Sequence, residues 1–168
     1  DHLECSLDGA SFTACTSPTQ YTTPQITDGT HTFEVLSVDN STNSDPSPAQ
    51  LTWNVDTVPP ETTILSASDG NQSTVTIGQN ISSKLMTIAF SGNDTGGVGV
   101  DHLECSLDGA SFTACTSPTQ YTTPQITDGT HTFEVLSVDN STNSDPSPAQ
   151  FTWNVDTIPP TTNITKAM

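Results

Sequence analysis

The stretch that decides the fold is DGTHTFEVLSVDNSTNSDPSPAQFTWNVDT at residues 128–157. Apolar residues alternate with polar ones at two places in it, and they are Phe133 and Val135 in the first run and Phe151, Trp153 and Val155 in the second. Turn-forming residues precede the first run at Asp128-Gly129 and separate the two runs at 143–146. A period of two indicates strands with one buried face, and clusters of Gly, Pro, Asn and Asp indicate turns.

The same alternation continues toward the N-terminus of this stretch. It is formed by Met86, Ile88 and Phe90 in one run and by Leu103, Cys105 and Leu107 in another. Further turn signals lie at 68–71, 92–94 and 108–109, and no segment shows a helical period. Several short strands separated by regular turns predict an all-β fold of tandem immunoglobulin-like antiparallel β-sandwich domains. The shared face of Phe151 and Trp153 is predicted to pack in the core of the sandwich rather than to form an aromatic platform for sugars.

The sequence repeats itself with a period of 100 residues. Residues 1–50 recur without change at 101–150, and LTWNVDTVPP then matches FTWNVDTIPP with differences at Leu51/Phe151 and Val58/Ile158. This period is longer than those of solenoid repeats, which are about 20–50 residues. It equals the size of one small β-sandwich domain, about 100 residues.

Pro-Pro pairs at 59–60 and 159–160 mark the domain boundaries, because a proline pair ends a strand and forms a stiff connector. We predict that residues 1–57 are the C-terminal part of one immunoglobulin-like repeat, 58–157 a complete repeat, and 158–168 the start of the next. Residues 1–57 lack the strands that 61–91 supply to the complete repeat, which leaves an apolar face uncovered. Either the segment belongs to a longer array, or a neighbouring copy donates the missing strands.

The charge of the chain excludes several partners. The chain contains nineteen acidic residues and only two basic ones, Lys84 and Lys166, so its formal net charge is −17. Such a chain does not neutralise phosphates, so we expect no nucleic-acid binding and no attraction to anionic membranes. No apolar run approaches the roughly 18 residues of a membrane span, so we expect no membrane insertion in this segment.

Cysteines occur as two per repeat, Cys5 and Cys15 and then Cys105 and Cys115, with nine residues between the members of a pair. The turn at Asp108-Gly109 places Cys105 and Cys115 on opposite arms of one hairpin, which favours a local disulfide in an exported protein. Closing so short a loop stabilises the fold by about 2–3 kcal/mol. The alternatives are free thiols or a zinc site, but zinc would require four ligands at close spacing, and the sequence offers no such set.

Six Asn-x-Ser/Thr sequons are candidate glycosylation sites, at Asn40, Asn71, Asn80, Asn93, Asn140 and Asn163. They fall mostly in predicted turns, where an exposed surface would accept glycans. Because Ser and Thr are abundant in this chain, chance occurrence is the alternative interpretation.

Acidic residues gather near both ends of the predicted complete domain, namely Asp56, Glu61, Asp94, Asp101, Asp139 and Asp145. Ca²⁺ binds six to eight oxygen ligands of this kind, so these residues are a candidate structural calcium site. The EF-hand spacing is absent, and ordinary turns capped by Asp on a solvated surface are the alternative interpretation. We expect no other cofactor.

No catalytic motif is present. The chain contains no G-x-S-x-G, P-loop or dinucleotide fingerprint, and its four histidines lack a second histidine at metal-binding spacing. We predict that His131, at the start of a strand, is a half-exposed strand residue and that the chain is not an enzyme.

Three motifs carry a family resemblance that spans the whole chain. They are ECSLDG…C at 104–115, DGTHTFEV at 128–135 and TWNVDTIPP at 152–160, with the string GNDTGGVGVD before them at 92–101. The chain resembles the immunoglobulin-like repeats of large bacterial and archaeal cell-surface proteins. The resemblance implies an extracellular location, a role as stalk, spacer or adhesive array, and stiffening by Ca²⁺ as in many relatives.

Two functions follow as expectations. The first is a structural repeat of an extracellular filament, surface layer or stalk, with copies of itself as head-to-tail partners. The second is an adhesin module that binds glycans or another cell surface. Identical repeats favour the first, because a stalk needs copies whereas recognition usually lies in one divergent domain.

Overall fold

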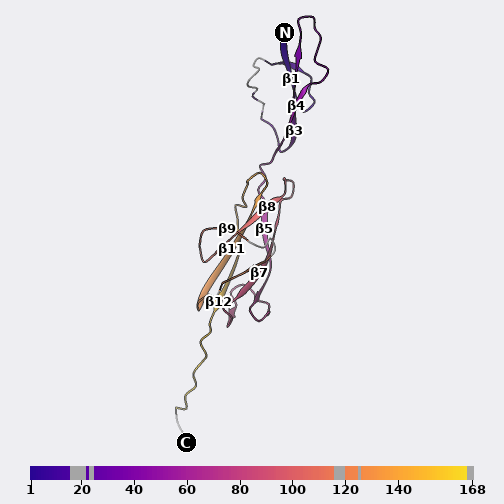
Figure 1. Cartoon of the computed structure of the whole chain (residues 1–168). Helices are drawn as coiled ribbons and strands as arrows, with labels where there is room; N and C mark the ends of the chain where they lie inside the picture. The colour runs from indigo at the N-terminus through magenta and orange to yellow at the C-terminus, as the bar shows by residue number, and fades with distance from the viewer. Residues whose placement is uncertain (16–21, 23–24, 116–119, 125, 166–168) are drawn as a thin grey trace. The chain divides into compact units, whose positions relative to one another are not determined.

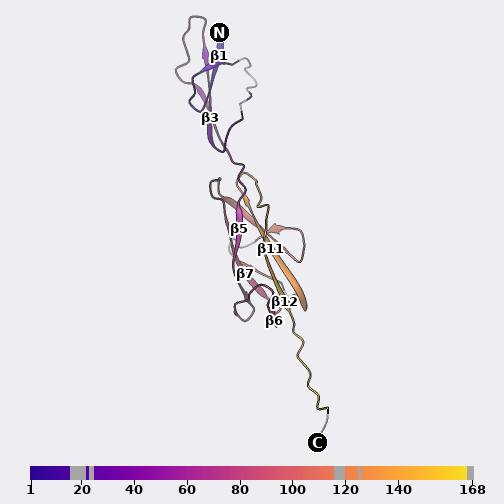
Figure 2. The ribbon, with the colours of Figure 1, turned by 180° about the vertical axis from the view of Figure 1, so that it is seen from behind.

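The computed structural model describes residues 1–15, 22, 25–115, 120–124 and 126–165, and Figures 1 and 2 show it from two sides. The last three residues of the predicted 158–168 segment lie outside this part. The chain divides into two compact units, Asp1–Val58 (unit 1) and Pro59–Met168 (unit 2). All regular elements of the described residues are β-strands, which confirms the predicted all-β class. No described segment forms a helix of the length and apolarity that crossing a membrane requires.

Unit 1 contains one antiparallel sheet among its described residues, with the strand order β2-β1-β3-β4. Its strands are β1 (His2–Leu7), β2 (Thr13–Cys15), β3 (Gly29–Val38) and β4 (Ala49–Val55). The turn after β1 passes through Asp8 and Gly9, whose φ angles are +55° and +72°. Glycine and aspartate tolerate this left-handed backbone better than bulky residues, so the Asp-Gly pair forms the turn.

Unit 2 contains two sheets that pack against each other. The larger sheet, in the order β6-β12-β11-β8-β9, consists of β6 (Asn80–Ile81), β12 (Ala149–Val155), β11 (Gly129–Asp139), β8 (Val100–Leu107) and β9 (Thr113–Ala114). The smaller sheet, in the order β10-β7-β5, consists of β10 (Gln120–Thr122), β7 (Met86–Asn93) and β5 (Glu61–Asp69). Both views show β5 and β7 beside β11 and β12.

One strand pair differs from the antiparallel prediction. β6 runs parallel to β12, with Asn80 opposite Asn154 and Ile81 opposite Val155, whereas the other pairings of described strands are antiparallel. The chain leaves β5 in the smaller sheet and adds β6 to the edge of the larger one. A connection that crosses between sheets does not impose the antiparallel direction of a hairpin, so the alternation of residues could not reveal this pair.

The core of unit 2 lies between its two sheets and uses the predicted alternating residues. Met86, Ile88, Phe90, Phe133, Val135 and Trp153 are 0% exposed, and Phe151 is 6% exposed. The rings of Phe90 on β7 and Phe133 on β11 lie 5.8 Å apart between centroids, so they join the two sheets directly. Each such side chain contributes about 1.5–3 kcal/mol when it is fully buried.

A polar contact also joins the two sheets of unit 2. The hydroxyl groups of Thr62 on β5 and Ser137 on β11 are 2.8 Å apart. Beside them the backbone of Gly92 approaches so closely that an added Cβ would lie 2.3 Å from the Ser137 Oγ. Gly92 is therefore required by the close approach of β7 to β11.

Both disulfides expected from the sequence are present. Cys5 bonds to Cys15 and Cys105 to Cys115, with Cα atoms 5.8 and 5.6 Å apart. In each unit the bond links the arm before the Asp-Gly turn to the arm after it. It holds a hairpin whose second strand is only two or three residues long.

Candidate functional site

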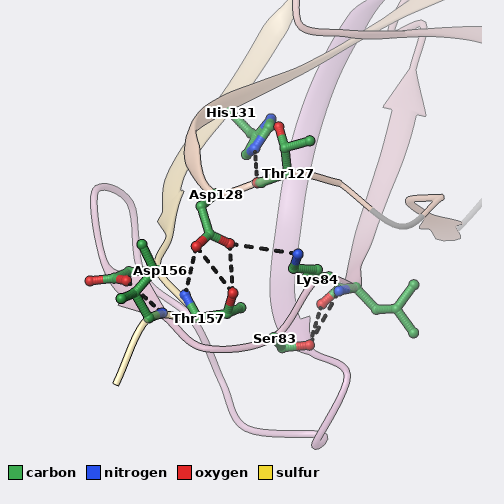
Figure 3. A network of polar contacts seen from close by, with 9 residues as sticks. Ser83, Lys84, Thr127, Asp128, His131, Asp156 and Thr157 are labelled. Atoms are coloured by element: carbon green, nitrogen blue, oxygen red, sulfur yellow. Dashed lines mark hydrogen bonds and ion pairs between the residues drawn. The ribbon is translucent and has the colours of Figure 1, made fainter. Parts of the chain in front are cut away.

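In unit 2, the point at which the chain leaves β12 is held by two aspartates (Figure 3). The Oδ1 atom of Asp156 accepts a hydrogen bond from the backbone N–H of Ile158, at 3.0 Å. The carboxylate of Asp128, just before β11, accepts bonds from the Thr157 N–H at 3.2 Å and from the Thr157 hydroxyl at 2.8 and 3.1 Å. These contacts fix the backbone immediately before the Pro-Pro pair.

The Asp128 carboxylate is stabilised in its ionised form. The hydroxyl and then the backbone N–H of Thr157 lower the pKa of Asp128 against a smaller effect of desolvation, and Lys84 contributes in the same direction. The Lys84 Nζ lies 3.8 Å from the Asp128 Oδ1. Charge-assisted hydrogen bonds are stronger than neutral ones, so the exit is held most firmly when Asp128 is ionised.

His131 connects this exit to the disulfide hairpin. Its Nδ1 lies 2.7 Å from the Asp108 Oδ2, and its Nε2 lies 2.8 Å from the backbone oxygen of Thr127 (Figure 3 shows the second contact). The ring also packs against Trp153, with centroids 5.8 Å apart. Both partners accept hydrogen bonds, so the ring satisfies both contacts only when each nitrogen carries a proton.

The electrostatics of His131 follow from these contacts. Burial lowers its pKa, but the hydrogen bonds to Asp108 and Thr127 and the charge of Asp108 outweigh burial, and the pKa is raised above its ordinary value. The prediction of a half-exposed strand residue was wrong, since His131 is 7% exposed. The physical reason is that the turn at Asp108 supplies a carboxylate that balances the charge of the buried ring.

Unit 1 contains the same arrangement at the equivalent positions. His31 lies 2.7 Å from both the Asp8 carboxylate and the Thr27 oxygen, Asp28 accepts bonds from Thr57, and Asp56 accepts one from the Val58 N–H. The hydrogen bond from His31 lowers the pKa of Asp8, and the bond to Asp8 raises the pKa of His31.

We call the residues Asp108, Thr127, Asp128, His131, Asp156 and Thr157 the exit network of unit 2. Starting at the disulfide hairpin, the network passes from Asp108 through His131 to the Thr127–Asp128 segment and then to Thr157. The sequence predicts 108–109 and 128–129 only as turns and does not indicate these residues as a group. Their recurrence in both copies at fixed spacing was the available signal.

The structure brings together only some of the acids considered for calcium. In unit 2 a carboxylate oxygen of Asp94 and one of Asp139 lie within 4.8 Å of each other. Glu61 is exposed at the start of β5, Asp101 pairs with the His102 ring at 2.8 Å, and Asp145 accepts bonds from Ser147. Within the described residues, these three belong to no cluster of potential ligands, and Asp56 lies in unit 1.

Asp94 has an unusual environment. Its Oδ2 accepts a hydrogen bond from the Gly99 N–H at 2.7 Å, whereas its Oδ1 is buried and has no hydrogen-bond partner within the described structure. The loop folds so tightly over this carboxylate that a Cβ on Gly97 would lie 2.3 Å from both oxygens. Asp139 is 1% exposed and accepts bonds from Ser141 and Asn143.

All six sequon asparagines are exposed, but their amides differ. The Asn140 amide nitrogen donates to the backbone oxygens of Val98 and Gly99, at 3.1 and 2.8 Å. Asn80 lies in β6 and accepts a bond from Asn154, and the amide of Asn93 contacts Thr95 within its own sequon. The remaining three, Asn40, Asn71 and Asn163, lie outside the strands.

No family model matches the chain, and no curated protein matches it in sequence. Solved structures with a similar fold include fibronectin(III)-like modules of Clostridium thermocellum CbhA, at 13% identity and a TM-score of 0.49, covering 92% of this chain and 77% of that one. Another is the extracellular domain of the putative hybrid two-component system BT3049 from B. thetaiotaomicron, at 14% identity and a TM-score of 0.45, covering 71% and 19%. A third is dimeric latent PorU from Porphyromonas gingivalis, at 15% identity and a TM-score of 0.42, covering 94% and 20%.

Proposed function

We propose that this chain is a structural part of an extracellular protein, a stalk, filament or surface layer built head to tail from near-identical immunoglobulin-like domains. The exit network is the observation that carries this proposal. In an array of domains, each domain sets the orientation of the next one only if the backbone that leaves it has a fixed direction. Asp128, Thr157 and Asp156 hold that backbone, and the Pro-Pro pair that follows limits its bending.

The disulfides support the extracellular location. Both pairs of cysteines are bonded, and disulfides persist in oxidising compartments and are rare in the cytosol. The net charge of −17 would keep a long, repetitive surface protein soluble and separate from nucleic acids. The partners that we propose are copies of the same repeat.

We assign the chain no catalytic activity. His31 and His131 have acceptors at both ring nitrogens, so neither ring presents a nitrogen that could act as a general base. The adhesin alternative would need exposed aromatic side chains for glycans. The large apolar side chains that are exposed in the described part of the chain are all aliphatic, with Leu65 at 62% and Ile77 at 72% as examples.

We also propose that a Ca²⁺ ion binds unit 2 at Asp94 and Asp139. The buried and unpartnered Oδ1 of Asp94 supports this proposal, because a buried carboxylate oxygen without a partner is unfavourable and a cation would satisfy it. Calcium should raise the melting temperature of the chain, and EDTA should reverse the effect. Asp94→Asn should remove the response. Melting curves that are the same in excess calcium and in EDTA would exclude this site.

Antibodies raised against the chain test the location in the organism that encodes it. The proposal predicts that they label intact cells or isolated surface filaments. Labelling that requires permeabilised cells would refute an extracellular role.

Single-molecule pulling tests the mechanical role. Unit 2 should unfold in one step, and a reductant should lengthen that step by about 30 Å, because ten residue steps of about 3.5 Å each then replace the 5.6 Å between the bonded Cα atoms. Asp128→Asn should lower the unfolding force, and Asp45→Asn in unit 1 serves as a control for the loss of one carboxylate. Unit 2 extending without a force peak would show that it cannot serve as a mechanical spacer.

A further inference from the structure

The sheet of unit 1 has the same strand pairing as the larger sheet of unit 2. Phe33 pairs with Leu51 across β3 and β4, and Phe133 pairs with Phe151 across β11 and β12. β1 pairs with β3 in the same register in which β8 pairs with β11, with Leu3 opposite Ser37 and Leu103 opposite Ser137. Residues 1–50 and 101–150 are identical, so the two sheets present the same side chains on the same face, except for Leu51 in place of Phe151.

In unit 2 this face is covered by the segment 59–93. β7 contributes Phe90, which packs on Phe133, and β5 contributes Thr62, whose hydroxyl lies 2.8 Å from that of Ser137. The same segment also bonds along the edge of β12, where the Gly78 N–H donates to Thr152 O at 2.7 Å, and it supplies β6, whose Ile81 O accepts from the Asp156 N–H at 2.9 Å. The segment therefore binds its sheet by apolar contacts, a hydroxyl contact and main-chain hydrogen bonds.

In unit 1 the same face has no second sheet over it among the described residues. Phe133, Val135, Ser137 and Trp153 are 0% exposed, whereas Phe33, Val35 and Trp53 are only half-buried and Ser37 is exposed. Leu51 is 64% exposed, and its counterpart Phe151 is 6% exposed. β4 is the last strand in the order β2-β1-β3-β4, so its outer edge pairs with no described strand.

We propose that the open face of unit 1 and the outer edge of β4 bind a segment with the sequence of residues 59–93 from another copy of the repeat. The bound segment adds β5-, β6- and β7-like strands and completes a second sandwich. Its Phe90 packs on Phe33, its Thr62 hydroxyl meets Ser37, and its Ile81 lies beside Val55, as their counterparts do in unit 2.

The donor must be a segment whose own sheet does not compete for it. Exchange between two folded copies of this chain uncovers one sheet for each sheet that it covers, so it buries no additional apolar surface and is opposed by the loss of translational freedom. A segment without a sheet of its own gains the whole contact. Binding therefore needs a free segment, and we do not expect two intact chains to exchange theirs at equilibrium.

Titration of the intact chain with a separately produced peptide of residues 59–93 tests this inference. Calorimetry should show one peptide bound per chain, because unit 2 is already covered and serves as an internal control. A peptide that carries Ile88→Lys should not bind, since the new charge would lie in the core. A peptide with the same composition in scrambled order should not bind either.

Variants of the chain locate the peptide. Val35→Lys places a charge on the open face of β3 and should abolish binding, whereas Thr32→Lys places the same charge on the opposite face and should leave it unchanged. If Val35→Lys unfolds unit 1, the Ile88→Lys peptide still decides the outcome.

Three results would overturn the inference. The first is no binding of the wild-type peptide, and the second is two peptides bound per chain. The third is a dimer of intact chains that the Val35→Lys substitution dissociates but that added peptide does not dissociate. In that case the open face would bind the open face of a second chain. The inference rests on the fold alone, so any of them would leave the proposed extracellular role standing.

Discussion

The repeat offers a matched test of core packing, because the same phenylalanine occurs in two environments. Phe133 is 0% exposed and packs against Phe90 at 5.8 Å, whereas the identical Phe33 is only half-buried. Phe133→Ala removes a fully buried ring and leaves a cavity between the sheets. For such substitutions the lost transfer free energy and the cavity together amount to about 3–5 kcal/mol. A domain of this size has a total stability of about 5–15 kcal/mol, so the loss should be large.

Unfolding in guanidinium chloride measures this loss. A Trp53→Phe background leaves Trp153 as the single tryptophan, and its fluorescence then reports on unit 2. With a dependence of about 4 kcal/mol per molar denaturant, Phe133→Ala should lower the midpoint by about 1 M. Phe33→Ala is the control and should leave the Trp153 transition within about 0.5 kcal/mol. Equal shifts for the two substitutions, or a loss below 1 kcal/mol for Phe133→Ala, would refute the assignment of the core.

Three further predictions use the same comparison between copies or the electrostatics of unit 2. The pKa of His131 is raised in the folded state, so its contribution to stability is complete below about pH 6.5 and is lost as the pH rises through the folded-state value; urea midpoints should fall from pH 6 to 9, and His131→Asn should reduce that slope. Ser137→Ala removes a buried hydroxyl that contacts the Thr62 hydroxyl on the other sheet, and it should destabilise unit 2 by about 1 kcal/mol. Ser37→Ala, at an exposed position, should change the stability of unit 1 by a few tenths of a kcal/mol at most, and equal effects of the two substitutions would contradict the packing described. If glycans are added to the folded chain, Asn40 should be occupied more often than Asn140, whose amide is held by two backbone oxygens, and glycopeptides that extend to Leu51 or Phe151 distinguish the two sites by mass spectrometry.

The strands that carry the core were predictable from local pattern. Alternation at 86–90, 133–135 and 151–155 identifies residues that the structure buries, because successive side chains of a strand point to opposite faces. Pairing of Cys105 with Cys115 followed from one short hairpin, in which both partners are close in sequence. The parallel pairing of β6 with β12 had no such local signal, because it joins residues 74 positions apart through a change of sheet.

The exit network shows why the candidate site was only partly predictable from the sequence. Asp108, Thr127 and His131 each look like ordinary turn or strand residues, and their contacts form only when the hairpin and β11 are adjacent. For calcium, acidic composition suggested six residues, but composition carries no distances. The fold brings Asp94 close to Asp139 and places Asp101 beside His102 instead.

Sequence alone was sufficient for the strand pattern, the hairpin disulfides and the repeat, because each depends on residues that are neighbours along the chain or on identity between two stretches. Tertiary structure decided which faces are covered. Identical residues are fully buried in unit 2 and partly exposed in unit 1, since burial depends on what packs against a side chain and not on its identity. The same dependence raises the pKa of His131, whose Asp108 partner lies 23 residues away in the chain.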